Sequence, residues 1–214
     1  AEQNGFKMYD CYTGFKWIAS VIRENEGKAR YIGGGEESYG FLPEDFVRDK
    51  DSVSSISLMA EIAAWAKDKG MTMYQMLQDI YIKYGYSKEK GISVVRKGKS
   101  GAEEIVAMMK NFRENPMKEL GGSPVILIKD YASLEATDMV NGTKSKLDMP
   151  VTSNVLQYFS ADGSKVSIRP SGTEPKIKFY IEVRGIKMDN YADYDAANAA
   201  ADAKIEAIKK ELGI

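Results

Sequence analysis

Residues 155–184 read VLQYFSADGSKVSIRPSGTEPKIKFYIEVR, and this stretch decides the fold of the second part of the chain. Residues 155–160 and 165–169 are rich in β-branched and aromatic residues, and the Gly-containing turn 161–164 joins them as in a hairpin. Residues 177–184 then alternate, with Ile, Phe, Ile and Val on one side and Lys, Tyr, Glu and Arg on the other. This pattern predicts an antiparallel sheet with one apolar and one wet face.

The segments around this stretch predict an α+β layout for residues 86–214. We expect strands at 92–96 and 124–129, a turn at Asn141-Gly142, and a helix over 101–115 that Pro116 stops. A last Ala-rich helix is expected over 191–212, with a packing stripe formed by Ala197, Ala201, Ile205, Ile208 and Leu212. Helices covering one face of an antiparallel sheet form a stable two-layer domain.

Residues 1–85 predict a different, α/β arrangement. A strand at 8–12, a helix at 14–25 and a strand at 29–32 would make a βαβ-like unit in a mixed sheet with helices. Two helices follow, over 54–69 and from an N-cap at Thr72 to Tyr84, and their apolar stripes, rich in alanine and methionine, are expected to be core faces. Because two strands are marginal alone, we expect this part to be a fragment of a larger domain, cut into on its N-terminal side.

Composition excludes several classes of protein. Hydrophobic residues make up 43% and charged residues 29% of the 214 residues, as in ordinary globular proteins. The net charge of -1 argues against a nucleic-acid partner, and no apolar run approaches the roughly 18 residues of a membrane span. The single cysteine, Cys11, permits no internal disulfide, which favours a reducing compartment such as the cytoplasm.

The chain contains no histidine, so any site must be built from carboxylates, Lys, Arg, hydroxyls and backbone amides. Those groups suit the binding of sugars and phosphates. Cys11 lacks the usual imidazole partner of a nucleophilic thiol, and we expect it to be a partly buried strand residue instead.

The loop 169–176, Arg-Pro-Ser-Gly-Thr-Glu-Pro-Lys, carries the strongest chemical signal. Arg169 can bind a phosphate through two hydrogen bonds, and Lys176 adds a point charge. Ser171, Thr173 and the amides around Gly172 can complete a set of donors for an anion. The same residues could also form a rigid hairpin loop with solvated charges.

A second loop, 33–40, reads Gly-Gly-Gly-Glu-Glu-Ser-Tyr-Gly. Its adjacent carboxylates would repel phosphate, but carboxylates and a hydroxyl on a glycine scaffold suit the vicinal hydroxyls of a sugar. The alternative is a solvated glycine-rich turn.

Gly35-Glu36-Glu37-Ser38-Tyr39-Gly40 resembles the sugar-binding loop of the α-D-phosphohexomutases, the phosphoglucomutase and phosphomannomutase family. Residues 169–176 resemble that family's phosphate-binding loop, and Thr13-Gly14-Phe15-Lys16 resembles the segment whose lysine faces the active cleft. The two loops occur in the family's order. The resemblance implies that residues 1–85 are the C-terminal part of the third domain and residues 86–214 are the fourth domain.

The resemblance implies transfer of a phosphoryl group between O1 and O6 of a hexose, through a hexose 1,6-bisphosphate and a phosphoserine with Mg²⁺. Glu36 and Ser38 would hold sugar hydroxyls, and Lys16 would contact the sugar or assist at the reacting end. The phosphate that is not reacting would be held by Arg169, Ser171, Gly172 and Thr173, with Lys176 beside them.

The family's Ser-His phosphoserine loop and its Asp-Gly-Asp-x-Asp-Arg metal loop have no counterpart here. Asp49-Lys50-Asp51 and Asp193-Tyr194-Asp195 lack the third Asp and the Arg. We therefore expect no catalytic nucleophile and no metal site in this chain, and a partner role for N-terminal domains of the same protein. A non-catalytic module that binds sugar phosphates or other anions is the alternative function. Nucleic-acid binding on the second domain's sheet would need more exposed aromatic residues than Tyr180.

Overall fold

The computed structural model describes residues 1–36, 40–96, 98–172 and 174–214. The chain forms two compact units, Ala1–Met76 and Leu77–Ile214, here called the N-terminal unit and the C-terminal unit. Helix α3 (Met73–Tyr84) begins in the first and ends in the second. Among the described residues, no helix has both the length and the apolar character that a membrane crossing requires.

The N-terminal unit has a small core on one helix. Ahead of α3 its elements are η1 (Glu2–Asn4), α1 (Phe15–Glu24), β1 (Gly34–Gly35), β2 (Phe41–Leu42) and α2 (Ser52–Asp68). Phe15, Ile18 and Ile22, spaced to share one face of α1, pack with Leu42 and with the half-buried Tyr31. The helix predicted over 14–25 is therefore confirmed, and so is the one predicted over 54–69.

The strands predicted at 8–12 and 29–32 are wrong. Both segments are irregular, and β1 and β2 instead pair antiparallel as a small hairpin, with Gly34 opposite Leu42. A strand needs a neighbour to satisfy its backbone groups, and no described segment pairs with either stretch. Met8 is 69% exposed and Cys11 is also exposed, so the prediction of a partly buried strand cysteine fails with them.

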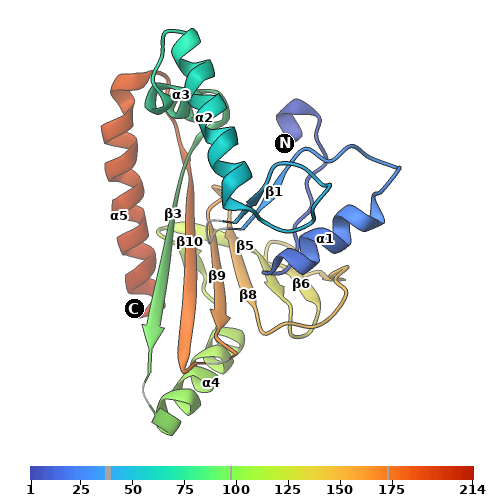
Figure 1. The fold of residues 1–214 in the computed structure, drawn as a ribbon. Coiled ribbons are helices and arrows are strands. Elements are labelled where there is room, and N and C mark those ends of the chain that lie inside the picture. Colours follow the sequence, from blue (N-terminus) through green and yellow to red (C-terminus); the bar gives the residue numbers. More distant parts are fainter. Residues whose placement is uncertain (37–39, 97, 173) are drawn as a thin grey trace. The chain divides into compact units, whose positions relative to one another are not determined.

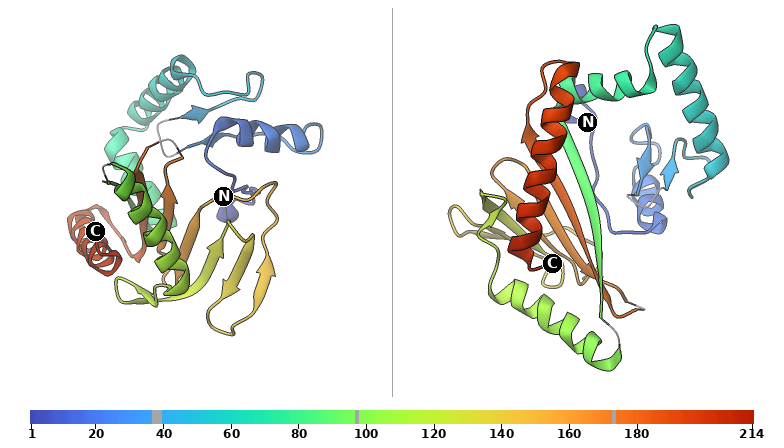
Figure 2. Two further views of the ribbon diagram at one scale, coloured as in Figure 1. Left: turned by 90° about the horizontal axis from the view of Figure 1, so that it is seen from below. Right: turned by 90° about the vertical axis from the view of Figure 1, so that its left-hand side faces the viewer.

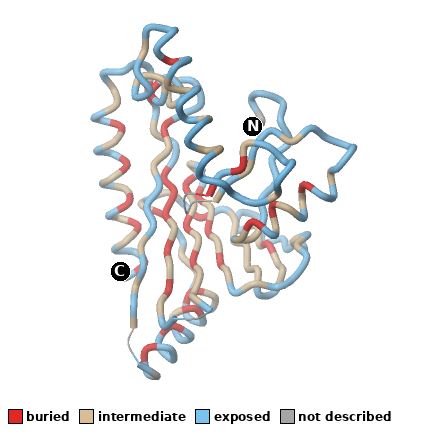
Figure 3. Tube along the Cα trace, in the orientation of Figure 1, coloured by how far each residue is buried: buried red, intermediate tan, exposed pale blue. Residues whose placement is uncertain are grey.

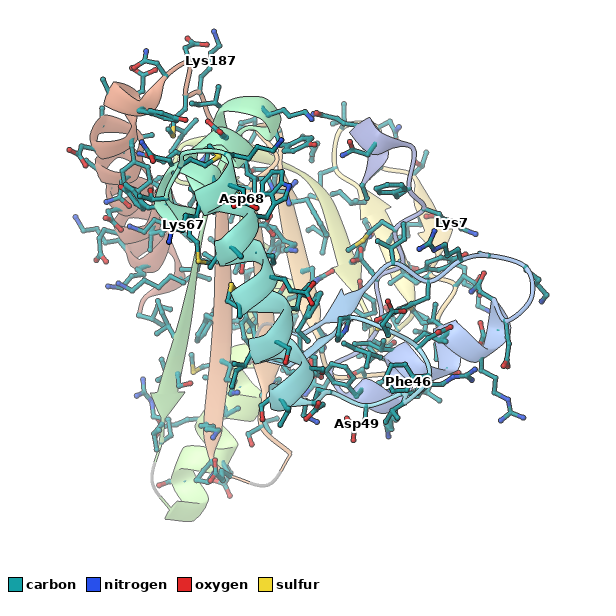
Figure 4. The ribbon with its side chains drawn as sticks, turned by 45° about the horizontal axis from the view of Figure 1, so that its top comes forward. Lys7, Phe46, Asp49, Lys67, Asp68 and Lys187 are labelled. Atoms are coloured by element: carbon teal, nitrogen blue, oxygen red, sulfur yellow. The ribbon has the colours of Figure 1, made fainter. Side chains whose placement is uncertain are left out.

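The predicted apolar stripe of α2 exists, but this structure leaves most of it uncovered. Asp51 caps the helix by accepting hydrogen bonds from the amides of Val53 and Ser54. Ile56 and Met59 are exposed, and only Ala66 is fully buried. Figure 4 labels Phe46 and Asp49 on the loop that leads to α2, and Lys67 and Asp68 at its end. The stripe of α3 behaves similarly, since Met73, Leu77 and Ile80 are exposed.

The C-terminal unit is built on an eight-stranded antiparallel sheet. In chain order its elements are β3 (Tyr86–Val95), α4 (Gly98–Glu114), β4 (Glu119–Leu120), β5 (Ser123–Asp130), β6 (Glu135–Asp138), β7 (Lys144–Lys146), β8 (Leu156–Ser160), β9 (Lys165–Pro170), β10 (Lys176–Ile186), η2 (Tyr191–Asp193) and α5 (Tyr194–Leu212). The spatial order is β3-β10-β9-β8-β5-β6-β7, with β4 paired to β5 (Figure 1).

Helices α4 and α5 cover one face of this sheet (Figure 2). Alternate residues of β10, among them Ile177, Phe179 and Ile181, turn into the core and are buried. The stripe predicted on the last helix, Ala197, Ala201, Ile205, Ile208 and Leu212, is buried against them. Figure 3 shows these buried positions along α5 and the central strands. The predicted fold class, an α/β part followed by a two-layer α+β domain, is confirmed.

The start of one strand was predicted too late in the sequence. β3 begins at Tyr86 rather than residue 92, and it pairs with β10 along its whole length. Its first residues looked like a polar break in the sequence. Tyr86 is nevertheless buried, and Lys88 lies 2.7 Å from Asp202 of α5, so partners far along the chain stabilise this polar end.

The N-cap predicted at Thr72 is confirmed. The Thr72 hydroxyl accepts a hydrogen bond from the Gln75 amide at 3.1 Å, and the Gln75 side chain accepts one from the Thr72 amide at 2.8 Å.

Candidate functional site

The glycine loop, residues 33–40, includes β1, and its described residues Glu36 and Gly40 join β1 and β2 at the end of their hairpin. The amide of Glu36 donates to the carbonyl of Gly40 at 2.8 Å and closes the turn. A Cβ on Gly35 would lie 2.9 Å from that carbonyl oxygen, and one on Gly40 would lie 2.7 Å from the Phe15 ring. A side chain at Gly35 would therefore meet backbone, and one at Gly40 would meet the Phe15 ring, so neither position has room for one.

Glu36 joins this loop to the start of α1. Its carboxylate accepts a very short hydrogen bond from the amide of Gly14, the N-cap of the helix, whose φ of 117° favours glycine. The predicted residues Glu36 and Lys16 therefore sit on segments that the structure connects. The ammonium of Lys16 lies 4.9 Å from the centre of the Trp17 ring. Ser38, the other predicted sugar contact, lies outside the described residues.

Tyr31 packs against the β1–β2 hairpin and bonds to it, a role that the sequence patterns did not suggest. Its hydroxyl donates to the carbonyl of Leu42 at 2.9 Å. Burial, with Asp45 and Glu44 nearby, raises the pKa of Tyr31 to about 12, so the hydroxyl remains a donor at neutral pH. Cys11 is exposed, yet neighbouring atoms partly desolvate its thiol, and Asp10 and Glu36 add negative charge; these effects raise the pKa of the thiol, which argues against a reactive thiolate.

The second predicted loop joins β9 and β10 of the C-terminal unit. The amide of Ser171 donates to the carbonyl of Lys176 at 2.8 Å, which extends the ladder beyond the pair of Pro170 with Ile177. Inside the loop, the amide of Glu174 donates to the Ser171 hydroxyl at 3.3 Å. The hairpin is therefore braced by its own hydrogen bonds. Thr173 lies outside the described residues, and Gly172 is exposed.

Lys176 faces a neighbour in the same loop. Its ammonium forms a close ion pair with the carboxylate of Glu174, and this hydrogen bond lowers the pKa of Glu174. The predicted point charge of Lys176 is thus already partly balanced within the loop.

Arg169 has a different environment. It is half-buried on the face of the sheet opposite the core, and its partner across the β9–β10 ladder is Lys178. Like charges directly opposite one another destabilise a sheet. Within the described residues, no carboxylate forms a close ion pair with either cation, but the charge of Glu174 interacts with Lys178, whose ammonium also lies 6.0 Å from the centre of the Tyr180 ring. The pair is therefore a site where an anion would relieve repulsion as well as gain hydrogen bonds.

Lys178 is the residue that the sequence reasoning missed, because the alternation of β10 made it an ordinary solvated position. The pairing register of β9 and β10 identifies Lys178, which the alternation of residues along β10 could not do. Once 169–176 is accepted as a hairpin with Ser171 bonded to Lys176, counting back along both strands brings Lys178 opposite Arg169.

The Mg²⁺ that the resemblance implies does not fit the described residues. Among residues 1–36, 40–96, 98–172 and 174–214, no three Asp, Glu or Cys side chains gather as a metal site would require.

Comparison with known proteins places both loops in one family. The family model described as "Phosphoglucomutase/phosphomannomutase, alpha/beta/alpha domain III" matches residues 1–84. The model described as "Phosphoglucomutase/phosphomannomutase, C-terminal domain" matches residues 127–201. The glycine loop lies within the first match, and the loop of Arg169 lies within the second.

Similar proteins agree with this assignment. A phosphoglucomutase from Staphylococcus aureus is 38% identical over 192 residues, which are 90% of this chain and 34% of that protein. One from Staphylococcus haemolyticus is 34% identical over 191 residues, 89% of this chain and 34% of its own length. The chain thus spans about a third of the length of the curated relatives it matches.

A solved structure shares the fold. The crystal structure of the Paramecium exocytosis-sensitive phosphoprotein pp63/parafusin, in its open form, matches all of this chain and 36% of that protein, with a TM-score of 0.60 and 20% identity. With domain III matched at the glycine loop and the C-terminal domain matched at the Arg169 loop, the chain belongs to the phosphoglucomutase/phosphomannomutase family.

Proposed function

We propose that this chain is the C-terminal part of a cytoplasmic phosphohexomutase that moves a phosphoryl group between O1 and O6 of a hexose phosphate. Residues 1–85 would be the end of its third domain, and residues 86–214 would be its fourth. The observation that carries the proposal is the Arg169–Lys178 pair, two cations opposite each other on the β9–β10 ladder, neither of them in a close ion pair with a described carboxylate.

The loop of Arg169 is suited to the phosphate that is not reacting. The guanidinium can donate two parallel hydrogen bonds to phosphate oxygens, and the Lys178 ammonium adds charge beside it. Ser171, Gly172 and Thr173 would supply hydroxyl and amide donors, with Lys176 at the end of the loop. Because the hairpin is braced internally, little ordering of the chain would be needed on binding.

The glycine loop is suited to the sugar. Glu36 and Ser38 would bind hydroxyls, and Lys16 would contact the sugar or the reacting end. One carboxylate oxygen of Glu36 accepts from Gly14, which fixes the side chain. The other oxygen would accept from a sugar hydroxyl. A site that hydrogen-bonds particular hydroxyls can select strongly between sugars, because a mismatch leaves its polar groups unpaired.

The nucleophile and the metal would lie outside these 214 residues. The chain has no histidine for a Ser-His loop, and its described carboxylates do not fit Mg²⁺. We therefore propose that these residues bind and orient the hexose phosphate and the hexose 1,6-bisphosphate intermediate, and that N-terminal domains of the same protein perform the transfer.

The test uses two proteins, the 214-residue chain and the complete product of its gene. With glucose 1-phosphate, Mg²⁺ and glucose 1,6-bisphosphate, we expect sustained formation of glucose 6-phosphate only from the complete product. Conversion by the 214 residues alone would contradict the proposed division of labour. A complete product that binds glucose 1-phosphate but never converts it would instead support a non-catalytic sugar-phosphate module.

A further inference from the structure

The connection between β3 and α4 meets the Arg169 loop at Arg96. The amide of Arg96 donates to the carbonyl of Pro175 at 2.9 Å. This bond continues the β3–β10 ladder one step past the pair of Val95 with Lys176, and so reaches into the loop. This hydrogen bond connects the β9–β10 hairpin to a residue outside it, whereas the bonds of Ser171 and Glu174 lie within the hairpin.

Two glycines allow the chain to turn from strand to helix at this point. Gly98, the first residue of α4, has a φ of 77°, which side-chain-bearing residues rarely adopt. A Cβ on Gly101 would lie 2.5 Å from both the carbonyl carbon and the carbonyl oxygen of Arg96. Real Cβ atoms do not approach backbone so closely, so any side chain at 101 must displace Arg96 or the first turn of α4.

The Arg96 side chain adds a third contact, because its Nε lies 3.2 Å from a carboxylate oxygen of Glu104 on α4. The Arg96 backbone therefore lies close to the first turn of α4 at Gly101, its guanidinium pairs with Glu104 of the same helix, and its amide bonds to the loop. A displacement of its backbone would be passed to Pro175 and from there to the hairpin that carries Arg169.

We propose that Gly101 is a positioning residue for the Arg169 loop: by leaving room for the Arg96 backbone, it sets the loop in the conformation that binds phosphate. This inference rests on the proposed function, in that it assumes the Arg169 loop binds phosphate.

Gly101→Ala tests the idea, with Gly91→Ala as its matched control. Gly91 lies on β3, and a Cβ there would meet nothing within 4 Å. We expect Gly101→Ala to weaken inorganic phosphate binding by the 214-residue chain about tenfold, the value of one charge-assisted hydrogen bond. Gly91→Ala should bind like the unchanged chain. Calorimetric titration with phosphate measures all three dissociation constants.

A destabilised helix alone could mimic this result, so a third variant separates stability from positioning. Ile105, on α4, is buried in the core cluster of the C-terminal unit. Ile105→Ala should lower the melting temperature while leaving phosphate affinity within about twofold. If Ile105→Ala loses as much affinity as Gly101→Ala at equal loss of stability, the positioning role is wrong.

A measurement on the unchanged chain covers the case in which Gly101→Ala does not fold. Phosphate that stabilises the loop must also stabilise the bond between Arg96 and Pro175, so amide exchange at Arg96 should slow on phosphate binding. Slower exchange at Ser171 and Gly172 with no change at Arg96 would overturn the inference while leaving the proposed function intact. If phosphate does not bind, or if Arg169→Ala binds it equally well, the proposed function fails instead.

Discussion

At the scale of single residues, we propose different roles for the two loops because their charges differ. Arg169 and Lys178 present two cations on one face of the sheet, whereas Glu36 presents a carboxylate fixed by the Gly14 amide. A phosphohexomutase needs both, since its substrate carries a phosphate that must be held and hydroxyls that must be recognised. Contacts to the phosphate should be indifferent to the sugar, and contacts to the hydroxyls should discriminate.

Glu36→Gln and Ser171→Ala separate these two roles. Glutamine can keep the hydrogen bond from Gly14 through its carbonyl oxygen but loses the charge that binds hydroxyls, so Glu36→Gln should change the ratio of kcat/KM between glucose and mannose 1-phosphates. Ser171→Ala should lower both values by a similar factor. The measurement is steady-state kinetics of the complete protein. The reverse pattern would mean that the glycine loop is not the specificity loop.

Asp162, in the turn between β8 and β9, predicts how stability depends on pH. Partial burial alone would raise its pKa, but hydrogen bonds from Lys204, Ser160 and Ser164 outweigh this and hold the pKa well below the usual range. The unfolded chain therefore binds more protons at acid pH. The stabilisation is complete above the unfolded pKa of about 3.9 and is lost as the pH falls toward the folded value.

Asp162→Asn should accordingly destabilise the C-terminal unit by about 1–2 kcal/mol near neutral pH, the value of one or two hydrogen bonds. The difference from the unchanged chain should shrink as the pH falls below about 4. Urea unfolding across this range measures it, with the exposed ion-paired Asp189 changed to Asn as control. A difference that grows toward acid pH would contradict the assignment.

At the scale of elements, α5 shows how burial follows from periodicity. Its five buried residues recur at helical spacing and fill the space over β10, while the intervening positions are mostly polar. The helix ends at Leu212, and the φ of 72° at the C-cap Gly213 turns the chain away from the helix axis. This helix packs on the core face of β10 and its neighbours. It therefore stabilises the sheet whose opposite face carries Arg169 and Lys178.

Ile205→Ala should lower the free energy of unfolding of the C-terminal unit by about 2–5 kcal/mol, because it opens a cavity in a fully packed core. Val106 on α4 is 70% exposed, and Val106→Ala should cost less than about 0.5 kcal/mol. Chemical unfolding of both variants provides the comparison. Equal losses would mean that the core does not lie where the structure places it.

Elements with strong local signals could be predicted from the sequence, and elements that depend on distant partners could not. The stripe of α5, the cap at Thr72 and the hairpin 161–164 all follow from spacing within a few residues. The start of β3 was missed because Tyr86 and Lys88 gain their stability from β10 and α5. The strand expected at 8–12 has the right residue types, but the described part of the chain offers it no neighbouring strand to pair with.

The candidate site divides in the same way. The identities of Arg169 and Glu36 followed from local motifs, while Lys178 required the register of two strands and Gly101 required the path of the backbone near Arg96. Neither of these two residues lies in a motif of its own.

At the scale of the whole molecule, the chain carries the two candidate loops on two units that belong to one family. The chain aligns with about a third of the length of its relatives, and the family models it matches are domain III and the C-terminal domain. Binding of the hexose phosphate should therefore be measurable in these 214 residues even where turnover is absent. The phosphate loop is the part of the account on which the rest depends.

The most direct test is a titration of the isotopically labelled chain with glucose 1-phosphate, followed by amide chemical shifts. The amides of Ser171 and Gly172 should shift saturably, glucose without phosphate should not reproduce these shifts, and Arg169→Ala or Lys178→Ala should weaken them. Lys187→Ala, which removes an exposed cation of the same unit, should leave them unchanged. If Arg169→Ala and Lys187→Ala behave alike, or if the shifts lie away from residues 169–178, the Arg169 loop is not the phosphate site and the account is wrong.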